Sequence, residues 1–282
     1  MLRRLFNNRI VVADYPIDPL PRCPNGNVHI KALLNRQRDN FRASISKMTS
    51  ALPIAETISS EFWGNEWFPP VDAITLMSFI AHHKPRIYFE VGSGYSTTAA
   101  RHAANELGLD MRIISIDPKP RADIDALCDT MIRAPFEKVQ PGVYGAVGPG
   151  DVVFIDNSHY CFQGSDATTV FLELLPSLPA NVLVGIHDIF LPFDYPDVWR
   201  RRFYNEQYAL ATYLFGLGDR ACVELPAFLV TNDESYSGDL ATIRSFLDGK
   251  NARFQGCAFW FVSAHPTGVT SEPTPHKRFH KS

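Results

Sequence analysis

The chain has 282 residues, of which 45% are hydrophobic, enough to bury the core of one large α/β domain with additional elements. The net charge is −3 and no basic stripe runs through the central region, so nucleic acid is not the expected partner. No apolar segment reaches the roughly 18–20 residues that a membrane-spanning helix requires, and the N-terminus lacks the apolar core of a signal peptide.

The cysteines are scattered, odd in number and without C-x-x-C spacing. This pattern is typical of buried thiols in a reducing compartment, with neither a disulfide framework nor a zinc site. We therefore expect a cytoplasmic protein. The five positions are Cys23, Cys128, Cys161, Cys222 and Cys257.

The first part of the chain predicts an extended segment followed by helices. Residues 14–27 are rich in proline and asparagine and cannot hold a helix or a central strand. Residues 28–52 have the apolar spacing of a helix, and 61–70 form an aromatic segment that ends in two prolines. Asp72 is expected to cap a helix that runs to about His83.

From residue 87 onward strands and helices alternate, which predicts a parallel sheet with helices on both faces. Two aromatic or β-branched strands close the ordered region, and the tail 265–282 is expected to be disordered because it has no apolar periodicity. The expected strands are 87–91, 112–116, 130–133, 151–155, 182–186, 221–231 and 257–264, and the expected helices are 96–107, 121–128, 165–175, 198–215 and 238–249.

Residues 87–96 carry the strongest functional signal. An apolar run reaches Glu90, Gly92 and Gly94 follow, and a helix then begins. A strand, a glycine turn and a helix N-terminus form the place where an α/β fold cradles a polar cofactor. Asp117, at the end of the next strand, is placed to accept hydrogen bonds from ribose hydroxyls. The pair predicts a nucleoside cofactor.

The details of the loop favour a cationic cofactor over a dinucleotide. Thr97 stands where a dinucleotide fingerprint has its third glycine, and the Glu90 carboxylate would face a pyrophosphate. A carboxylate suits the sulfonium and ammonium of S-adenosylmethionine better. A dinucleotide site and a glycine turn without any ligand remain the alternatives.

A polar rim is predicted at the carboxyl edge of the sheet, where ligands bind in such folds. Asp156 ends one buried strand, and His187 and Asp188 end its neighbour. These three could converge on a divalent cation such as Mg²⁺, or His159 or His187 could act as a general base. Alternatively, Asp156 caps a helix or accepts backbone amides.

The stretch 188–210 is long, aromatic and stiffened by proline. Long loops over a ligand-binding edge are commonly lids or substrate walls, whereas the alternative is a helix with packing aromatics. The rings suited to stacking on a sugar or an aromatic acceptor are Tyr195, Trp199, Tyr204 and Tyr208.

Together these motifs resemble the class I S-adenosylmethionine-dependent methyltransferases, and within them methyltransferase family 24, over roughly residues 63–264. Ser96 departs from the commonest pattern, which has a third glycine there, and is expected to cap the following helix. The matching segments are Glu-Val-Gly-Ser-Gly-Tyr-Ser-Thr (90–97), Ile-Ser-Ile-Asp (114–117), Val-Phe-Ile-Asp-Asn-Ser-His-Tyr (153–160) and Gly-Ile-His-Asp-Ile (185–189).

The resemblance implies a Rossmann-like, doubly wound, mostly parallel sheet with an antiparallel last strand and a helical N-terminal cap. It divides the chain into an N-terminal extension (1–62), a methyltransferase domain (63–264) and a basic tail (265–282). The two glycines would approach the methionine part of the cofactor, Glu90 would orient its amino-acid end and Asp117 would bind the ribose. The implied cofactor-binding residues are Glu90, Gly92, Ser93, Gly94, Tyr95, Ser96, Asp117 and Asp156.

The implied activity is O-methylation of a hydroxyl on a small molecule or saccharide, with Asp156, His159, His187 and Asp188 as catalytic residues. Metal-dependent relatives place acids at the same two strand ends, so Asp156, His187 and Asp188 are the expected metal ligands. The His187-Asp188 pair departs from their usual acid followed by acid or amide. A non-catalytic binding module and an NAD(P)-dependent oxidoreductase are the alternatives, and a homo-oligomer is left open.

Overall fold

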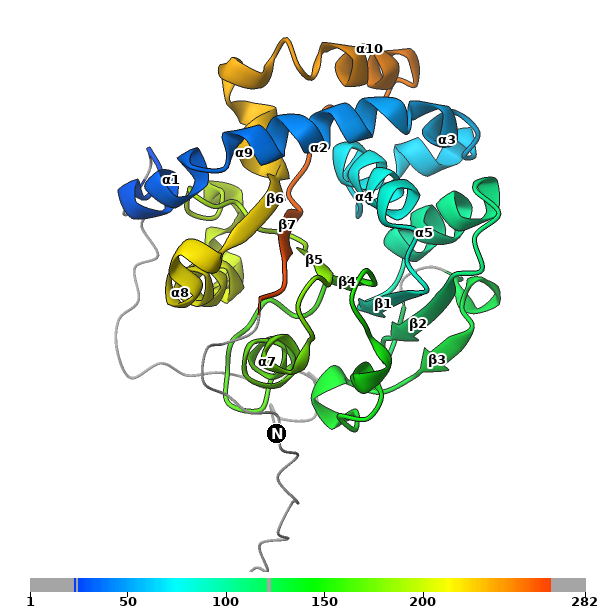
Figure 1. Ribbon diagram of the computed structural model, residues 1–282, viewed down its shortest axis with the longest axis vertical. Helices are drawn as coiled ribbons and strands as arrows, with labels where there is room; N and C mark the ends of the chain where they lie inside the picture. Colours follow the sequence, from blue (N-terminus) through cyan, green and yellow to red (C-terminus); the bar gives the residue numbers. More distant parts are fainter. Residues whose placement is uncertain (1–22, 24, 121–122, 265–282) are drawn as a thin grey trace, which may run out of the picture.

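The computed structural model describes residues 23, 25–120 and 123–264. They form a seven-stranded sheet of order β3-β2-β1-β4-β5-β7-β6, in which only β7 runs antiparallel to its neighbours (Figure 1). This confirms the predicted class I methyltransferase topology. The strands are β1 (Ile87–Val91), β2 (Arg112–Ile116), β3 (Thr130–Ile132), β4 (Val152–Ile155), β5 (Leu183–Ile186), β6 (Cys222–Pro226) and β7 (Phe259–Val262).

The central strands are buried on both faces, so they are mainly apolar rather than alternating, with Glu90 in β1 as the charged exception. Gly185 in β5 shows how tightly they pack. A Cβ atom there would lie 2.7 Å from the Trp260 ring and 2.8 Å from the Phe154 ring. Glycine is therefore required where this indole crosses the sheet.

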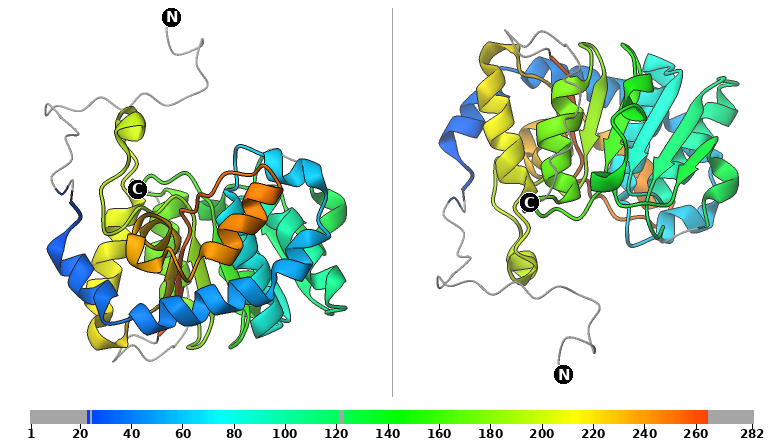
Figure 2. Two further views of the ribbon diagram at one scale, coloured as in Figure 1. Left: turned by 90° about the horizontal axis from the view of Figure 1, so that it is seen from above. Right: turned by 90° about the horizontal axis from the view of Figure 1, so that it is seen from below.

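Helices cover both faces of the sheet: α2, α4 and α5 lie on one side, and α7 and α8 on the other (Figure 1; Figure 2 gives two further views). The α-helices are α1 (Val28–Asn35), α2 (Arg38–Ser50), α3 (Leu52–Glu56), α4 (Pro70–His83), α5 (Tyr95–Glu106), α6 (Asp166–Thr169), α7 (Leu175–Ser177), α8 (Glu206–Leu217), α9 (Ala227–Asn232) and α10 (Ala241–Gly249). A π-helical segment (Val170–Leu174) joins α6 to α7.

The N-terminal helices protect the sheet edge at β6. Gln37 accepts the Val223 N–H at 2.6 Å, and Asn40 donates to the Val223 carbonyl at 3.3 Å. An edge strand otherwise presents unpaired backbone groups to solvent or to other chains. These helices share one hydrophobic core with the sheet, so the predicted domain boundary at residue 62 stays a prediction. The predicted tail, residues 265–282, lies outside the described residues.

Several predicted elements were wrong in extent. The helix expected over 28–52 is two helices, α1 and α2, followed by the start of α3. The first break lies at Arg36 and Gln37, and the Gln37 side chain binds β6. Within 121–128 the described residues form only a 3₁₀ turn, η3 (Asp125–Leu127). Asp72 does not cap α4, because its carboxylate accepts the N–H groups of Cys257 and Ala258.

The later elements also differ from the prediction. The strand expected over 221–231 ends at Pro226 and continues as α9, since proline cannot donate to the ladder. The helix expected over 198–215 is a 3₁₀ turn, η7 (Asp197–Arg202), followed by α8. Phe203, with φ +54°, separates the two because a helix cannot continue through a left-handed residue. Among the described residues, no helix has the length and apolar character needed to cross a membrane.

Candidate active site

The glycine loop after β1 lies against the ends of β2 and β4. Gly92 has φ +81° and donates its N–H to the Ile116 carbonyl at 2.9 Å. A Cβ atom on Gly92 would lie 1.8 Å from the Asp156 carbonyl oxygen, so no side chain fits there. A Cβ atom on Gly94 would meet no atom within 4 Å. The loop is therefore closed behind Gly92 and open at Gly94, where a ligand can approach the backbone.

Glu90 lies behind this loop rather than in it. Its buried carboxylate accepts hydrogen bonds from Tyr88 (2.8 Å), Ser96 (2.5 Å) and Thr97. Burial raises the pKa of Glu90 to about 7, although the three hydroxyls act in the opposite direction. The expected Ser96 cap is wrong: α5 has Gly94 at its N-cap, and Ser96 binds Glu90 instead. Glu90 thus ties the first turn of α5 to β1.

Asp117 at the end of β2 reaches the same loop. It accepts the Ser93 N–H at 2.8 Å and the Lys119 N–H at 2.6 Å, and remains half-buried. Tyr95 begins α5 and packs its ring edge on Phe62. The predicted cofactor residues of the first two strands therefore gather around one turn.

A second group surrounds the buried ring of His159, which follows β4. Nδ1 lies 2.9 Å from Glu206 Oε2, and Nε2 lies 3.5 Å from Asp156 Oδ1 and 3.4 Å from Asp188 Oδ2. Asn157 also donates to Glu206, at 2.8 Å. His159 and Asp188 both have positive φ, 62° and 57°. Such strained conformations cluster at functional sites.

The electrostatics of this polar cluster follow from the three carboxylates around one imidazole. Burial alone would lower the pKa of His159, but Asp156, Glu206 and Asp188 outweigh it and raise the pKa well above its usual value. Burial alone would raise the pKa of Asp156, yet His187 and His159 hold it below its usual range. The arrangement thus favours the protonated form of His159 and the ionised form of Asp156.

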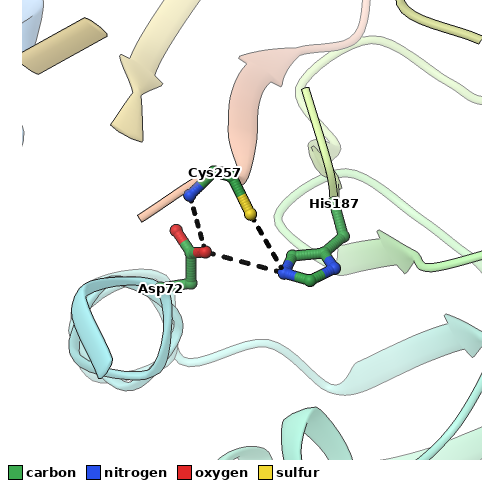
Figure 3. Close-up of side chains that lie close together, drawn as sticks. All are labelled: Asp72, His187 and Cys257. Carbon is green, nitrogen blue, oxygen red and sulfur yellow. Dashed lines mark hydrogen bonds and ion pairs between the residues drawn. The ribbon is translucent and has the colours of Figure 1, made fainter. Parts of the chain in front are cut away.

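His187, at the end of β5, is buried behind Asp156. Its Nδ1 lies 3.3 Å from Asp156 Oδ1 and 3.6 Å from Asp188 Oδ1. Its Nε2 faces the other way, toward Asp72 and Cys257 (Figure 3). Burial alone would lower the pKa of His187, but Cys257, Asp188 and Asp156 raise it well above its usual value. Because both ring nitrogens face protein groups, His187 is placed to orient Asp156 rather than to reach an acceptor.

The group that could hold a metal ion contains His159 in place of the predicted ligand His187. Ligand atoms of Asp156, His159 and Asp188 lie within 4.8 Å of one another, whereas His187 groups with Asp72 and Cys257. Of the predicted residues, Asp156, His159, His187 and Asp188 come together as expected. Sequence analysis missed Glu206, Asp72 and Cys257; the only signal was the acid at the start of a helix at Glu206, which was assigned to the lid.

The aromatic segment after β5 packs over the polar cluster. The Tyr204 ring lies 4.7 Å from the His159 ring, and Trp199 and Tyr195 contact Tyr204 at 5.8 and 6.0 Å. Tyr195 and Tyr204 come from the loop and Trp199 from η7, whereas Tyr208 belongs to α8, so the four rings do not form a single helical stripe. Figure 2 shows η7 standing away from the body of the molecule. Its role as a lid stays a prediction.

Two cavities lie away from this edge of the sheet. One, of about 430 Å³, is lined by Lys31, Phe193 and Tyr236, and another, of about 560 Å³, by Leu52 and Phe246. Neither borders the glycine loop or the polar cluster, so neither is assigned to the cofactor or the acceptor.

The strand order and the glycine loop define the class of S-adenosylmethionine-dependent methyltransferases, and the comparison of the sequence with known families agrees. Residues 89–189 match the family Methyltransf_24, described as a methyltransferase domain. The chain is thus an S-adenosylmethionine-dependent methyltransferase. No curated protein matches it.

Solved methyltransferase structures also resemble the chain at low identity. SAH-bound PaMTH1 from Podospora anserina is 20% identical, with a TM-score of 0.39 over 58% of this chain and 80% of that one. The plantazolicin methyltransferase BpumL with SAH is 14% identical, with a TM-score of 0.45 over 83% and 99%. A second BpumL structure, with SAH and a pentazolic desmethylPZN analog, is also 14% identical. Its TM-score is 0.44, over 80% of this chain and 99% of that one.

Proposed function

We propose that the protein methylates a hydroxyl oxygen of a small molecule or saccharide. The observation that carries this proposal is the polar cluster of Asp156, His159, Asp188 and Glu206, which adjoins the glycine loop through the contact of Gly92 with Asp156. A methyltransferase needs, beside its cofactor, a group that removes the acceptor proton. This cluster supplies several carboxylate oxygens that can accept a proton at that place.

The residues around the loop fit S-adenosylmethionine. Gly94 leaves its backbone open to a ligand, and Asp117 places a carboxylate where ribose hydroxyls would bind. When bound, the cofactor supplies a methyl group activated by the sulfonium charge. Glu90 would act indirectly, by holding Ser96 and Thr97 in the first turn of α5, rather than by contacting the amino-acid end.

Asp156 is the member of the cluster best placed to meet the acceptor. Its side chain is 35% exposed, compared with 6% for His159 and 14% for Asp188. Because the pKa of His159 is raised, its ring is poorly suited to take the acceptor proton, and we assign that role to a carboxylate. Because His159 and His187 lower the pKa of Asp156, it is a weak base. Such a base suits an acidic hydroxyl, such as a phenol.

A saccharide hydroxyl is less acidic and would need a stronger means of activation. A divalent cation held by Asp156, Asp188 and His159 would provide it, because two carboxylates and an imidazole suit such an ion and a Lewis acid lowers the pKa of a bound hydroxyl. His159 would have to lose its proton to become a ligand. The two versions therefore predict different acceptors.

A screen of metabolites with a labelled methyl donor tests the proposal, and chelation separates its two versions. Activity that is lost on brief chelator treatment and restored by Mg²⁺ supports the metal, whereas indifference to the chelator supports Asp156 as base. Titration calorimetry with SAH checks the cofactor independently. If SAH binds and no hydroxyl compound is labelled, O-methylation is wrong even though the cofactor assignment stands.

A further inference from the structure

A second side-chain group lies deeper than the polar cluster, and of its members only His187 also contacts Asp156. Asp72 comes from the first turn of α4, His187 from the end of β5 and Cys257 from the approach to β7 (Figure 3). All three are buried, with exposed fractions of 0%, 3% and 2%. A carboxylate, an imidazole and a thiol have therefore been brought together from three segments in the interior of the protein.

The spacing of these three groups is compatible with metal ligands, although the Cys257 thiol also hydrogen-bonds to His187 Nε2 and, at 3.3 Å, to Asp188 Oδ1. His187 Nε2 lies 3.6 Å from Asp72 Oδ2 and 3.5 Å from Cys257 Sγ. The carboxylate distance is too long for an N–H···O hydrogen bond, which spans about 2.7–3.2 Å. Ligands on a tetrahedral zinc, bound at about 2.0–2.3 Å, lie roughly 3.3–3.7 Å apart. The three ligand atoms all lie within 4.8 Å of one another.

The surroundings are those that orient ligands in metal sites. The two Asp72 oxygens accept the N–H groups of Cys257 and Ala258, at 2.8 and 3.0 Å, which fixes the carboxylate. The second nitrogen of His187 faces Asp156 at 3.3 Å. In zinc sites, a histidine that binds the metal through one ring nitrogen commonly donates from the other nitrogen to a carboxylate. The Phe68 ring packs against the His187 ring, with the two centroids 5.6 Å apart.

We propose that Asp72, His187 and Cys257 bind a zinc ion, with a non-protein ligand completing the tetrahedron. The donor set of one carboxylate oxygen, one imidazole nitrogen and one thiolate sulfur suits this borderline-soft metal. Binding exchanges two protons, one from the His187 imidazolium and one from the Cys257 thiol, for one Zn²⁺. With the Asp72 carboxylate, the net charge of the group is zero before and after the exchange.

The ion would tie α4, β5 and β7 together beneath the polar cluster, since Cys257 and Asp72 are 185 positions apart in the chain. It would therefore stabilise the fold and fix the position of His187, which in turn holds Asp156. This inference does not depend on the acceptor or on methyl transfer. It also concerns a different set of ligands from the cation considered at Asp156, His159 and Asp188.

The test uses the full chain, produced with zinc in the growth medium. Elemental analysis should give about one zinc per chain. Protein exchanged into Co²⁺ should show the near-ultraviolet charge-transfer band of a thiolate ligand, which an all-oxygen and nitrogen site cannot produce. Cys257→Ser should lose that band and most of the zinc, and Asp72→Asn should bind zinc more weakly.

Cys222→Ser is the matched control, because that half-buried thiol contacts Glu224 and Asn40 but no histidine; it should keep both zinc and the band. Wild-type protein that purifies without zinc, or whose Co²⁺ form lacks the thiolate band, overturns the proposal. The wild-type measurements decide the matter even where Cys257→Ser fails to fold. Zinc retained by Cys257→Ser at the wild-type level would also count against it.

Discussion

The glycine loop and the polar cluster meet at one edge of the sheet but are built differently. The loop is local: Glu90 binds Ser96 and Thr97, which are 6 and 7 positions away. The cluster is assembled over longer distances, since His159 and Glu206 are 47 positions apart. The cofactor side is thus specified by one short motif, whereas the acceptor side depends on how several segments are folded against each other.

This difference implies that cofactor binding and chemistry can be altered separately. Changes in the loop should alter SAH affinity, and changes in the cluster should alter turnover. The two regions touch where Gly92 meets the Asp156 carbonyl. That contact involves the Asp156 backbone, so the Asp156 side chain can be changed without disturbing the loop.

The largest effect is expected from Asp156→Asn. The amide keeps the size of the side chain but cannot accept the acceptor proton, so turnover should fall about 10²–10⁴-fold, as for loss of a general base. SAH affinity measured by calorimetry should stay close to that of the wild type. Methylation at the wild-type rate would leave catalysis by positioning alone, and a parallel loss of SAH binding would erase the separation between the two regions.

Gly92→Ala and Gly94→Ala form a matched pair within the loop. Alanine at 92 would collide with the Asp156 carbonyl and must adopt a positive φ, so we expect destabilisation by about 3 kcal/mol or more. Alanine at 94 meets no protein atom, so the melting temperature should hold while SAH binding weakens. Thermal denaturation measures the change in stability, and titration calorimetry measures the change in SAH binding. Equal melting temperatures for both variants would refute the packing described at Gly92.

The part of the molecule that the sequence predicted well is the part with short-range signals. The buried strand β4 is an uninterrupted apolar run, β1 is apolar except for Glu90, and the glycine turn between Glu90 and Thr97 has few alternatives. Predictions failed where tertiary contacts overrode local pattern. Gln37 lies within an apolar helical periodicity, yet its side chain binds β6 and the helix breaks beside it.

The acceptor side could be predicted only in part, for the same reason. Asp156, His187 and Asp188 end neighbouring strands, and parallel topology brings strand ends together. Nothing local indicates that Glu206 from α8 or Cys257 from the approach to β7 joins them. Cysteine spacing gave no sign of a zinc site, because two of the three proposed ligands are not cysteines and the segments are remote in sequence.

Glu90→Gln tests the burial of the carboxylate behind the loop. The folded pKa of Glu90 is raised from 4.5 to about 7, so the native state binds more protons between these values. Its contribution to stability is complete below about pH 4.5 and is lost as pH rises through 7. It amounts to about 3 kcal/mol. Chemical denaturation from pH 4.5 to 8 should show this decline in the wild type and a smaller one in the variant.

A wild-type profile and a Glu90→Gln profile that run parallel would mean that Glu90 is ionised throughout the range. The raised pKa values of His159 and His187 also reduce stability as pH increases above about 6.5. The difference between the two profiles, rather than either alone, therefore isolates Glu90.

Glu206→Gln tests the residue that sequence analysis assigned to the lid. The amide still fills the space at His159 Nδ1 but removes one negative charge, so the pKa of His159 should fall toward its usual value. We expect turnover to drop about 10- to 100-fold through loss of positioning, with a shift in the pH profile and little change in SAH affinity. A purely structural role would lower stability without moving that profile.

The smallest effect is expected on the cofactor side, at Asp117. Replacing it with alanine removes the carboxylate that accepts the Ser93 N–H and, in our proposal, the ribose hydroxyls. Loss of such charge-assisted hydrogen bonds should weaken SAH binding about tenfold, close to 1.4 kcal/mol. Asp117→Asn retains one acceptor oxygen and should fall between the wild type and Asp117→Ala. Turnover at saturating cofactor should be nearly unchanged in both variants, because Asp117 does not contact the polar cluster. If instead the maximal rate falls as far as it does in Asp156→Asn, the loop and the cluster act as one unit.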